Sequence, residues 1–430
     1  MDTIEKIYEL YKKAYTVTTD SRTISKDCVF VALKGEHFDG NDFALEAAEG
    51  GVAACVIADR QGLPRHERLF VVDDSLKTLQ ALANYHRRQL STPIIGITGT
   101  NGKTTTKELV SAVLAKKYSI VYTQGNYNNQ LGVPLTLLRV QPQAELAVVE
   151  MGASHPGDIR ELTEIGEPNF GIITNIGRAH LEGFGGFEGV IRTKNEMYEY
   201  IGAHNGMLFV NHDNELLMDL AKDIKKVTYG TSKGSDVEGK ILSANPYLSV
   251  AWNGKTIDTQ LVGDYNFENV MAAICIGKYF KVNDDDIVDA LSSYCPTNNR
   301  SQVIETGRNR VVMDAYNANP TSMAHALKNF RNICKDDNLL ILGDMRELGS
   351  ESQQEHQAIL ELIVSLGFDN VCLVGSEFSK LSESSEYSKF RSFPSVAELA
   401  EYLQEHPVNG KDILVKGSNS IHLNKIIDSL

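Results

Sequence analysis

PIIGITGTNGKTTTKELV, residues 93–110, joins a continuous apolar run to a helical pattern through a glycine-rich turn. The apolar run is typical of a strand buried on both faces of a parallel sheet, and the helical pattern starts near Lys103. Glycines let the N–H groups of such a turn approach one anion closely. We therefore expect a loop that binds nucleotide phosphates, with Lys103 at the terminal phosphates and the Thr104 hydroxyl on magnesium. The residues expected in this loop are Gly99, Thr100, Asn101, Gly102, Lys103, Thr104 and Thr105.

The loop departs from the most familiar phosphate-binding pattern. The spacing G-x-x-x-x-G-K-T requires glycine at position 97, where this chain has Ile97, and Gly96 stands one residue too early. A glycine-rich connection with an exposed lysine is the structural alternative. The position of the turn between a buried strand and a helix favours phosphate binding.

The composition is that of an acidic globular protein with about three domains. The chain has 430 residues, with 42 Lys and Arg against 56 Asp and Glu, and a formal net charge of −14. This charge argues against binding to nucleic acid or to an anionic membrane surface. No apolar run approaches about 18 residues and the first residues lack the apolar core of a secretory signal, so no membrane span is predicted. The six cysteines form no C-x-x-C pair, which favours reduced thiols in a cytoplasmic protein.

Alternating strand and helix patterns predict an α/β protein. We place three domains at residues 1–91, 92–297 and 298–430, because proline-containing turns interrupt the pattern at both boundaries. The first is expected to be a small α/β domain and the second a doubly wound parallel sheet of the P-loop ATPase type. The third repeats the alternation as a Rossmann-like α/β domain.

Four local features are also predicted. Residues 235–262 are expected to be an inserted β segment, and Ser75 is expected to cap the helix that follows it. The serine-rich residues 376–388 are typical of a loop, and the chain is expected to end in a helix.

Strings spread over the whole chain resemble the Mur ligase family and follow its order. They are TDSR (19–22), FVALKGEHFDGNDF (30–43), TGTNGKTT (98–105), GNYNNQLGVPLTLL (125–138), VVEMGASHPGDI (148–159), TNIGRAHLEGFG (174–185), TKNEMY (193–198), DAYNANPTSM (314–323), LGDMRELG (342–349) and KGS (416–418). The resemblance implies an N-terminal UDP-binding domain, a central ATP-binding domain and a C-terminal domain that completes the site.

Three of the strings, GNYNNQLGVPLTLL, DAYNANP and GDMRELG, resemble the branch of the family that adds D-alanyl-D-alanine. The resemblance implies that ATP activates the carboxylate of UDP-N-acetylmuramoyl-tripeptide as an acyl phosphate, which the dipeptide amine then attacks. ATP, these two small molecules and magnesium, with two ions expected, are the implied partners. Domain closure is expected during turnover, and a monomer is expected because three domains can complete one site.

Four alternatives stay open at this point. Another Mur ligase that adds a different amino acid, or a folylpolyglutamate synthase, would use the same chemistry. A P-loop GTPase or kinase is a different class, but the base-reading N-K-x-D motif is absent, since two isoleucines separate Asn424-Lys425 from Asp428. A nucleotide-sugar-binding protein without activity is disfavoured by the matching catalytic positions.

The family's catalytic positions carry over residue by residue. Glu150 ends the strand LAVVE and matches a magnesium-binding carboxylate, which suits a hard cation. His180 matches a ligand of the second magnesium ion, Lys194 a lysine that is often carbamylated, and Arg300 an arginine that contacts ATP. The implied catalytic residues are Lys103, Glu150, His180, Lys194 and Arg300, and the implied metal ligands are Thr104, Glu150 and His180.

Other matching positions are expected to bind the substrates. For ATP they are Asn269 at the adenine, Asp314 at the ribose, and Asn317. For the other substrates they are Ser21 and Arg22 at the uridine diphosphate, Asn128 and Asn129 at the muramoyl peptide, and Lys416 and Ser418 at the dipeptide. Two departures concern neighbours of these positions: Asn299 replaces a frequent glycine, and Asn419 replaces a frequent arginine and removes a cation.

Overall fold

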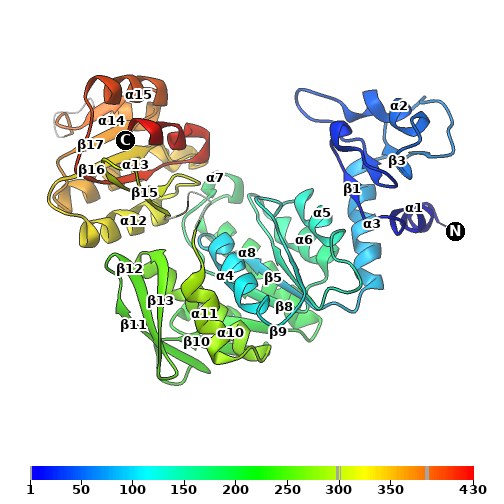
Figure 1. Ribbon diagram of the computed structural model, residues 1–430, viewed down its shortest axis with the longest axis horizontal. Coiled ribbons are helices and arrows are strands. Elements are labelled where there is room, and N and C mark those ends of the chain that lie inside the picture. The colour runs from blue at the N-terminus through cyan, green and yellow to red at the C-terminus, as the bar shows by residue number, and fades with distance from the viewer. Residues whose placement is uncertain (1, 297–299, 301, 383–386) are drawn as a thin grey trace.

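The computed structural model has three sheets, each flanked by helices, so the predicted three-part α/β fold is confirmed (Figure 1). It describes residues 2–296, 300, 302–382 and 387–430. The N-terminal unit lies at one end of the molecule, and the C-terminal unit lies against the opposite side of the central unit (Figure 1). The predicted boundary between residues 297 and 298 lies outside the described residues, and the domain boundaries stay predictions.

The N-terminal unit has a parallel sheet whose strands pair in chain order. Its elements are α1 (Thr3–Tyr11), β1 (Val17–Thr18), η1 (Ser21–Thr23), β2 (Val29–Val31), α2 (Ala44–Glu49), β3 (Cys55–Ala58), β4 (Leu69–Val71) and α3 (Ser75–Gln89). The cap of α3 is Asp74 and not the predicted Ser75, because the Asp74 carboxylate accepts the N–H of Lys77 at 2.9 Å. A carboxylate there also interacts favourably with the helix dipole.

The central unit is wound around one long sheet, with strand order β13-β12-β11-β10-β9-β8-β5-β7-β6. Its elements are β5 (Ile94–Thr98), α4 (Lys103–Leu114), β6 (Ile120–Tyr122), α5 (Gly132–Leu137), β7 (Leu146–Glu150), α6 (Asp158–Gly166), β8 (Phe170–Ile173), α7 (Leu181–Phe184), α8 (Phe187–Ala203), β9 (Met207–Asn211), α9 (Glu215–Leu220), β10 (Lys226–Gly230), β11 (Val237–Ser243), β12 (Tyr247–Trp252), β13 (Lys255–Val262), η3 (Asp264–Asn266), α10 (Phe267–Tyr279) and α11 (Asp284–Ser293). Because β5 pairs with both β7 and β8, the strand order reverses there. Ligands of open α/β sheets bind at the carboxyl end of such a switch point.

The predicted inserted β segment forms β11, β12 and β13, which extend the central sheet. β11 is parallel to β10, and the next two pairs are antiparallel. Asn253 and Gly254 join β12 to β13 with φ values of 48° and 71°, which is the conformation that tight hairpins require.

The C-terminal unit has five parallel strands and one antiparallel edge strand, in the order β14-β15-β19-β16-β17-β18. Its elements are β14 (Gln302–Glu305), β15 (Arg310–Asp314), α12 (Pro320–Ile333), β16 (Asn338–Gly343), η4 (Gly349–Glu351), α13 (Ser352–Ser365), β17 (Val371–Val374), α14 (Ser376–Ser382), β18 (Arg391–Phe393), α15 (Val396–Glu405), β19 (Asp412–Lys416), η5 (Asn419–Ile421) and η6 (Leu423–Ser429).

Two local predictions for this unit are wrong. The serine-rich stretch expected as a loop begins with helix α14, because the buried Asp344 accepts the N–H groups of Glu377 and Phe378, both at 3.0 Å. This cap comes from a distant strand, so the local sequence does not reveal it. The expected terminal helix is two 3-10 segments, separated at His422 by a left-handed φ of 60°.

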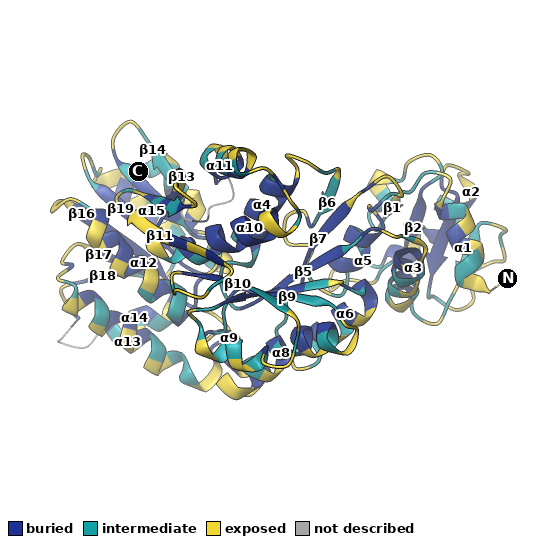
Figure 2. Cartoon of the chain, turned by 90° about the horizontal axis from the view of Figure 1, so that it is seen from below, coloured by how far each residue is buried: buried dark blue, intermediate teal, exposed yellow. Residues whose placement is uncertain are grey.

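Buried residues fill the strands and the inner faces of the helices, while exposed residues lie on the outer faces (Figure 2). Helix α3 packs on α1 and also on α5 and α6, so one hydrophobic core continues from the N-terminal unit into the central unit. No helix in the described parts of the chain is long and apolar enough to cross a membrane.

Candidate active site

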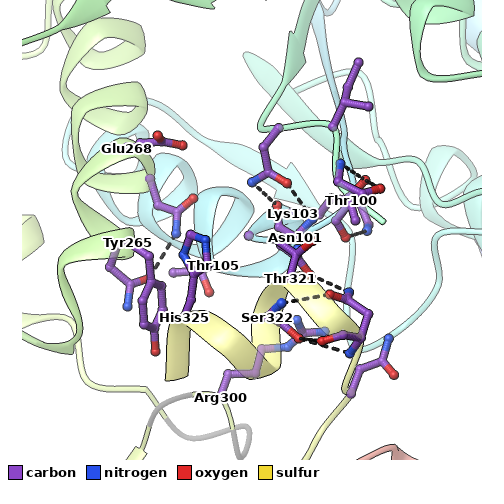
Figure 3. A pocket seen from close by; sticks show the side chains of 18 of the residues that line it. Thr100, Asn101, Lys103, Thr105, Tyr265, Glu268, Arg300, Thr321, Ser322 and His325 are labelled. Carbon is purple, nitrogen blue, oxygen red and sulfur yellow. Dashed lines mark hydrogen bonds between the residues drawn. The ribbon is translucent and has the colours of Figure 1, made fainter. Parts of the chain in front are cut away.

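A cavity of about 1000 Å³ lies between the carboxyl edge of the central sheet and the C-terminal unit. Figure 3 shows part of it, with phosphate-loop residues on one side and Thr321, Ser322 and His325 of α12 on the other. The predicted site residues that line it are Thr100, Asn101, Gly102, Lys103, Thr105, Asn128, Asn129, Glu150, His180, Asn269, Arg300, Asp314, Asn317 and Lys416. The fold therefore brings together residues far apart in the sequence, while their individual roles stay predictions.

The phosphate loop depends on two glycines in conformations that other residues rarely adopt. Gly99 has φ 141°, and a Cβ atom there would lie 2.0 Å from Oγ1 of Thr174. Gly102 has φ 78°, and its Cβ would lie 2.5 Å from Oδ1 of Asn269. These close approaches explain why glycine stands at both positions.

Lys103 folds back over the phosphate loop. Its Nζ donates to the carbonyl oxygens of Gly99 at 2.8 Å and Thr100 at 2.9 Å. Burial, opposed by the charge of Glu150 and reinforced by that of Arg300, lowers the pKa of Lys103 to about 8. A phosphate in the loop would favour the charged ammonium and restore a higher pKa.

Glu150 ends β7 and is buried beside the loop. Its Oε1 accepts the Thr104 hydroxyl at 3.2 Å and Nδ2 of Asn128 at 2.8 Å. Its Oε2 is buried and has no hydrogen-bond partner among the residues that the structure describes. A buried carboxylate oxygen without a partner is costly, and it fits a hard cation such as magnesium.

The protein groups present would hold magnesium only together with phosphates and water. In the described ranges, no cluster of three or more His, Cys, Asp and Glu side chains forms a complete metal site. Mg²⁺ is usually bound by one or two protein oxygens plus substrate phosphates and water. The Thr104 hydroxyl and the free oxygen of Glu150 fit that arrangement.

His180 lies in the loop after β8 and contacts the C-terminal unit. Its Nδ1 forms an ion pair with Oε2 of Glu347, and both residues have left-handed backbones, with φ values of 52° and 63°. The hydrogen bond from His180 lowers the pKa of Glu347. Glu347 was not among the predicted site residues, although it lies in the GDMRELG string at residues 343–349.

Other contacts join the same loop and the phosphate loop to the C-terminal unit. Arg178 pairs with Glu351 at 3.0 Å and with Glu355 at 3.1 Å. Nδ2 of Asn319, which caps α12, donates to Oδ1 of Asn101 at 2.8 Å. The phosphate loop is therefore in direct contact with the C-terminal unit.

Lys194 lies on α8, buried behind the cavity and not among its lining residues. Its Nζ is 5.5 Å from the centre of the Phe184 ring. Burial, reinforced by the charge of Lys103, holds the pKa of Lys194 well below its usual value. Burial at this position therefore favours the uncharged amine over the ammonium.

The C-terminal wall places Arg300, Asp314 and Lys416 at the cavity. The Arg300 guanidinium stacks 3.8 Å from the Tyr316 ring, and its Nε has no hydrogen-bond partner within the described residues. The buried Lys416 pairs with Asp314 at 2.5 Å and donates to the carbonyl of Asn317 at 3.2 Å. Residues predicted for the ribose and for the dipeptide thus contact each other.

An aromatic pair that was not predicted from the sequence also lines the cavity. The rings of Tyr265 in η3 and His325 in α12 meet edge to face, with centroids 6.2 Å apart (Figure 3). Burial lowers the pKa of His325, which favours the neutral ring over the charged one. Asn269 nearby accepts the Thr106 hydroxyl at 3.0 Å and donates to Asn266 at 2.9 Å. No motif marks Tyr265 or His325, because only the tertiary fold brings them together.

Three predicted substrate residues do not line the cavity. Ser21 and Arg22 lie on η1 of the N-terminal unit, where Arg22 is exposed and pairs with Asp20 at 2.6 Å. Ser418 is buried, and its hydroxyl accepts the N–H of Arg346 at 3.0 Å, which holds the loop before Glu347. The predicted ATP and metal residues Gly99 and Thr104 lie just behind the lining residues, within the phosphate loop and α4.

The chain matches three descriptions of one family in the expected order. These are the Mur ligase family catalytic domain over residues 13–87, the Mur ligase middle domain over 97–277, and the Mur ligase glutamate ligase domain over 299–419. The chain is also 33% identical over 425 residues to UDP-N-acetylmuramoyl-tripeptide–D-alanyl-D-alanine ligase of Bacillus subtilis (strain 168), an alignment that covers 96% of this chain and 92% of the relative.

Solved structures agree over the same length. MurF from Acinetobacter baumannii superposes with a TM-score of 0.85 at 30% identity, covering 96% of this chain and 92% of that chain. MurF ligase from Thermotoga maritima, in complex with ADP, has a TM-score of 0.81 at 26% identity, covering 100% and 98%. With this likeness over nearly its full length, the chain belongs to the Mur ligase family.

Proposed function

We propose that this protein is an ATP-dependent ligase that joins D-alanyl-D-alanine to UDP-N-acetylmuramoyl-tripeptide. The observation that carries the proposal is the cavity in which the phosphate loop and Glu150 face Arg300, Asp314 and Lys416 of another unit. The full-length likeness to relatives named for this reaction supports the choice of dipeptide over a single amino acid. Another Mur ligase activity or a folylpolyglutamate synthase activity is not favoured.

The reaction would proceed in two steps. A carboxylate oxygen of the tripeptide attacks the γ-phosphorus of ATP, and ADP leaves with the electrons of the broken P–O bond. The uncharged amine of the dipeptide then attacks the acyl carbon, inorganic phosphate leaves, and the nitrogen loses a proton. Positioning and charge neutralisation dominate such phosphoryl transfers, and closure keeps water from the acyl phosphate.

The residues of the central unit would hold the triphosphate. Loop N–H groups and Lys103 contact the phosphates after Lys103 leaves the loop carbonyls that it now binds. Magnesium held by Thr104 and Glu150, with His180 expected for a second ion, would supply positive charge to the crowded phosphates. For His180 this role requires that Glu347 release or share the ring.

Lys194 is proposed to react with carbon dioxide. Its amine nitrogen attacks the carbon of CO₂ and loses a proton, which converts a cationic side chain into an anionic carbamate. Only the uncharged amine can react in this way, and the lowered pKa of the buried Lys194 favours that form. The carbamate would then face the phosphate end of the cavity beside Lys103.

The remaining contacts would divide among the three substrates. Tyr265, His325 and Asn269 offer a surface for the adenine, while Asp314 offers its carboxylate to the ribose. Lys416, released from Asp314, would be free for the carboxylate of the dipeptide. At the far end, Ser21 and Arg22 would bind the uridine diphosphate, since arginine can hold a diphosphate with two parallel hydrogen bonds.

We also propose a cytoplasmic monomer. All six cysteines are free thiols, as is usual in a reducing compartment, and ATP is the co-substrate. One chain supplies both walls of the cavity, so no second copy is needed to complete it.

The test is a set of omission reactions analysed by mass spectrometry. With magnesium, ATP, UDP-N-acetylmuramoyl-tripeptide and D-alanyl-D-alanine together, we expect UDP-N-acetylmuramoyl-pentapeptide, ADP and phosphate. Omission of any one component should abolish the pentapeptide product. Product formation with a single amino acid in place of the dipeptide would overturn the proposed specificity, and nucleotide binding without turnover would overturn the enzyme assignment.

A further inference from the structure

Lys107, one helical turn beyond the phosphate loop, is a fully buried lysine that the proposed mechanism does not use. Its side chain has no exposed surface, although a buried ammonium is expensive unless it is paired. Nζ pairs with Glu108 at 2.6 Å, donates to the carbonyl oxygen of Thr123 at 2.8 Å, and lies 5.5 Å from the Tyr122 ring. Helix α4 thus places the Lys107 ammonium beside Thr123, at the end of β6.

Thr123 connects this lysine to the proposed magnesium ligand. Its hydroxyl oxygen accepts the backbone N–H of Glu150 at 2.9 Å, and its own N–H donates to the carbonyl of Val148 at 3.0 Å. The fully buried Thr123 therefore ties the end of β6 to the end of β7 by two hydrogen bonds. Lys107 holds the carbonyl of the same residue.

The loop that follows Thr123 returns to Glu150. It carries Asn128, whose Nδ2 donates to Oε1 of Glu150 at 2.8 Å and whose carbonyl accepts the N–H of Gly152 at 2.6 Å. On the other side, Thr104 lies three residues before Lys107 on the same helix face and donates to the same Oε1. All these contacts leave Oε2 free.

We propose that Lys107 is a positioning residue that fixes Glu150 for magnesium binding through Thr123. The ammonium holds the Thr123 carbonyl, Thr123 holds the main chain of Glu150, and the next loop holds Oε1 through Asn128. The rotation of the carboxylate is thereby restricted, and Oε2 is presented to the cavity. This inference rests on the proposed function for its metal, but it concerns the binding of the metal and not the ligation reaction.

The test is the affinity of the protein–ADP complex for Mn²⁺, measured by electron paramagnetic resonance as loss of the free-ion signal. Lys107→Met has similar length and no charge, so it removes the hydrogen bond to Thr123 with little change in volume. We expect Mn²⁺ to bind 10- to 100-fold more weakly, the usual size of losses when groups behind a metal ligand are removed. ADP affinity in the presence of EDTA should change less than about twofold.

Two further variants separate this role from simple stabilisation. Glu108→Gln removes the ion pair but leaves the bond from Lys107 to Thr123, so Mn²⁺ affinity should stay within about twofold of the parent protein. Thr123→Val removes the acceptor for the Glu150 N–H at nearly constant side-chain volume. It should weaken Mn²⁺ binding by about as much as Lys107→Met does. The combined loss should be smaller than the product of the two single losses, because both act on one connection.

The outcomes are decisive even if Lys107→Met fails to fold, because Thr123→Val then carries the test. Unchanged Mn²⁺ affinity in a folded Lys107→Met or Thr123→Val protein would overturn the proposal. Equal losses of ADP affinity with and without metal would also overturn it, since they would indicate damage to the phosphate loop. None of these binding measurements uses the tripeptide or the dipeptide. The result for Lys107 can therefore be interpreted even if the protein does not catalyse the proposed ligation.

Discussion

The two walls of the cavity are built differently. On the central wall, Glu150 is buried and held by Thr104, Asn128 and Thr123 through bonds of 2.8 to 3.2 Å. Beside the cavity, the contact with the C-terminal unit includes the ion pairs that Arg178, whose side chain is 53% exposed, forms with Glu351 and Glu355. Buried, hydrogen-bonded groups are preorganised, whereas exposed ion pairs contribute little and exchange readily with water.

From this difference we expect the central wall and the C-terminal unit to behave differently during turnover. The central wall would bind the nucleotide phosphates in nearly the geometry seen here, while the C-terminal unit moves on and off it. Domain closures of this kind complete a site and exclude water without rebuilding the rigid part. The following predictions test the rigid wall first and the movable contact last.

The largest effect is expected for Glu150→Gln. The amide keeps an acceptor for Thr104 and Asn128 but loses the charge offered by Oε2, so kcat should fall by about 10²- to 10³-fold. The free energy of unfolding should change by no more than about 1 kcal/mol, because the shape is preserved. Steady-state kinetics and chemical denaturation check both values.

Glu145→Gln is the matched control for that variant. Glu145 precedes the same strand at its opposite end and accepts the N–H of Ser119 at 2.8 Å, away from the cavity. Its kcat should equal that of the parent enzyme. A Glu150→Gln enzyme with more than a tenth of the parent activity would contradict the role of Glu150 in metal binding.

A somewhat smaller loss is expected for Lys194→Ala, about 10- to 100-fold in kcat. The parent enzyme should lose activity when carbon dioxide is removed and recover it with bicarbonate, because the neutral amine can form the carbamate again. Bicarbonate should not restore Lys194→Ala. Mass spectrometry of the native protein should detect the added carboxyl group.

Full activity of Lys194→Ala would exclude the proposed role. A parent enzyme indifferent to carbon dioxide, combined with an inactive variant, would instead assign Lys194 a role as an unmodified amine. In that case Lys194 would supply no negative charge behind Glu150 and the phosphate loop.

The pH dependence of nucleotide binding probes Lys103. Its pKa is lowered to about 8 in the free protein, so its charge is lost as pH rises through that value. Bound phosphates favour the charged form, so ADP binding near pH 8 should take up a fraction of a proton. Above pH 8 the affinity should fall by at most about tenfold per pH unit.

Calorimetry in buffers with different ionisation enthalpies measures this uptake directly. Lys103→Met should bind ADP more weakly and take up no proton at this position. If the parent protein binds ADP near pH 8 without proton uptake, then Lys103 is already charged and burial does not lower its pKa.

The phosphate loop and Glu150 could be predicted from the sequence more readily than the contacts between the central and C-terminal units, for a physical reason. The phosphate loop can be recognised locally, because a buried strand is followed directly by a glycine-rich turn. Glu150 can be recognised in the same way, because it is a polar residue at the carboxyl end of a buried strand. Only the tertiary fold reveals the contacts of Lys107, Tyr265 and His325, because their partners come from elements far apart in the chain. The same limit explains α14, which is capped by Asp344 from another strand.

Partners across the cavity were even less visible in the sequence. His180, expected to bind magnesium, pairs here with Glu347 of the C-terminal unit, whereas Lys416 pairs with Asp314 on the neighbouring strand of its own unit. Ser21 and Arg22, predicted to bind the uridine diphosphate, lie on η1 outside the cavity, and their role stays a prediction.

The smallest effect is expected for Arg178→Ala, which removes the ion pairs to Glu351 and Glu355. Exposed pairs contribute about 0.2 to 1 kcal/mol each and are weakened by salt. The two pairs together contribute about 0.4 to 2 kcal/mol, so the open form of the nucleotide-free protein should become about two- to thirtyfold more populated, while kcat at saturating substrates stays unchanged. Small-angle scattering should show a larger radius of gyration for the variant at low salt.

The response to salt concentration distinguishes the ion pairs of Arg178 from the buried contacts of Glu150. In the parent protein the radius of gyration should increase as salt is raised, and Arg178→Ala should already have the larger value and respond less. Arg178→Lys keeps a cation and should behave like the parent protein at low salt. If the parent and Arg178→Ala scatter alike at every salt concentration, the C-terminal unit is held by Asn101–Asn319 and His180–Glu347 instead, and the contact across the cavity is more rigid than its exposed ion pairs imply.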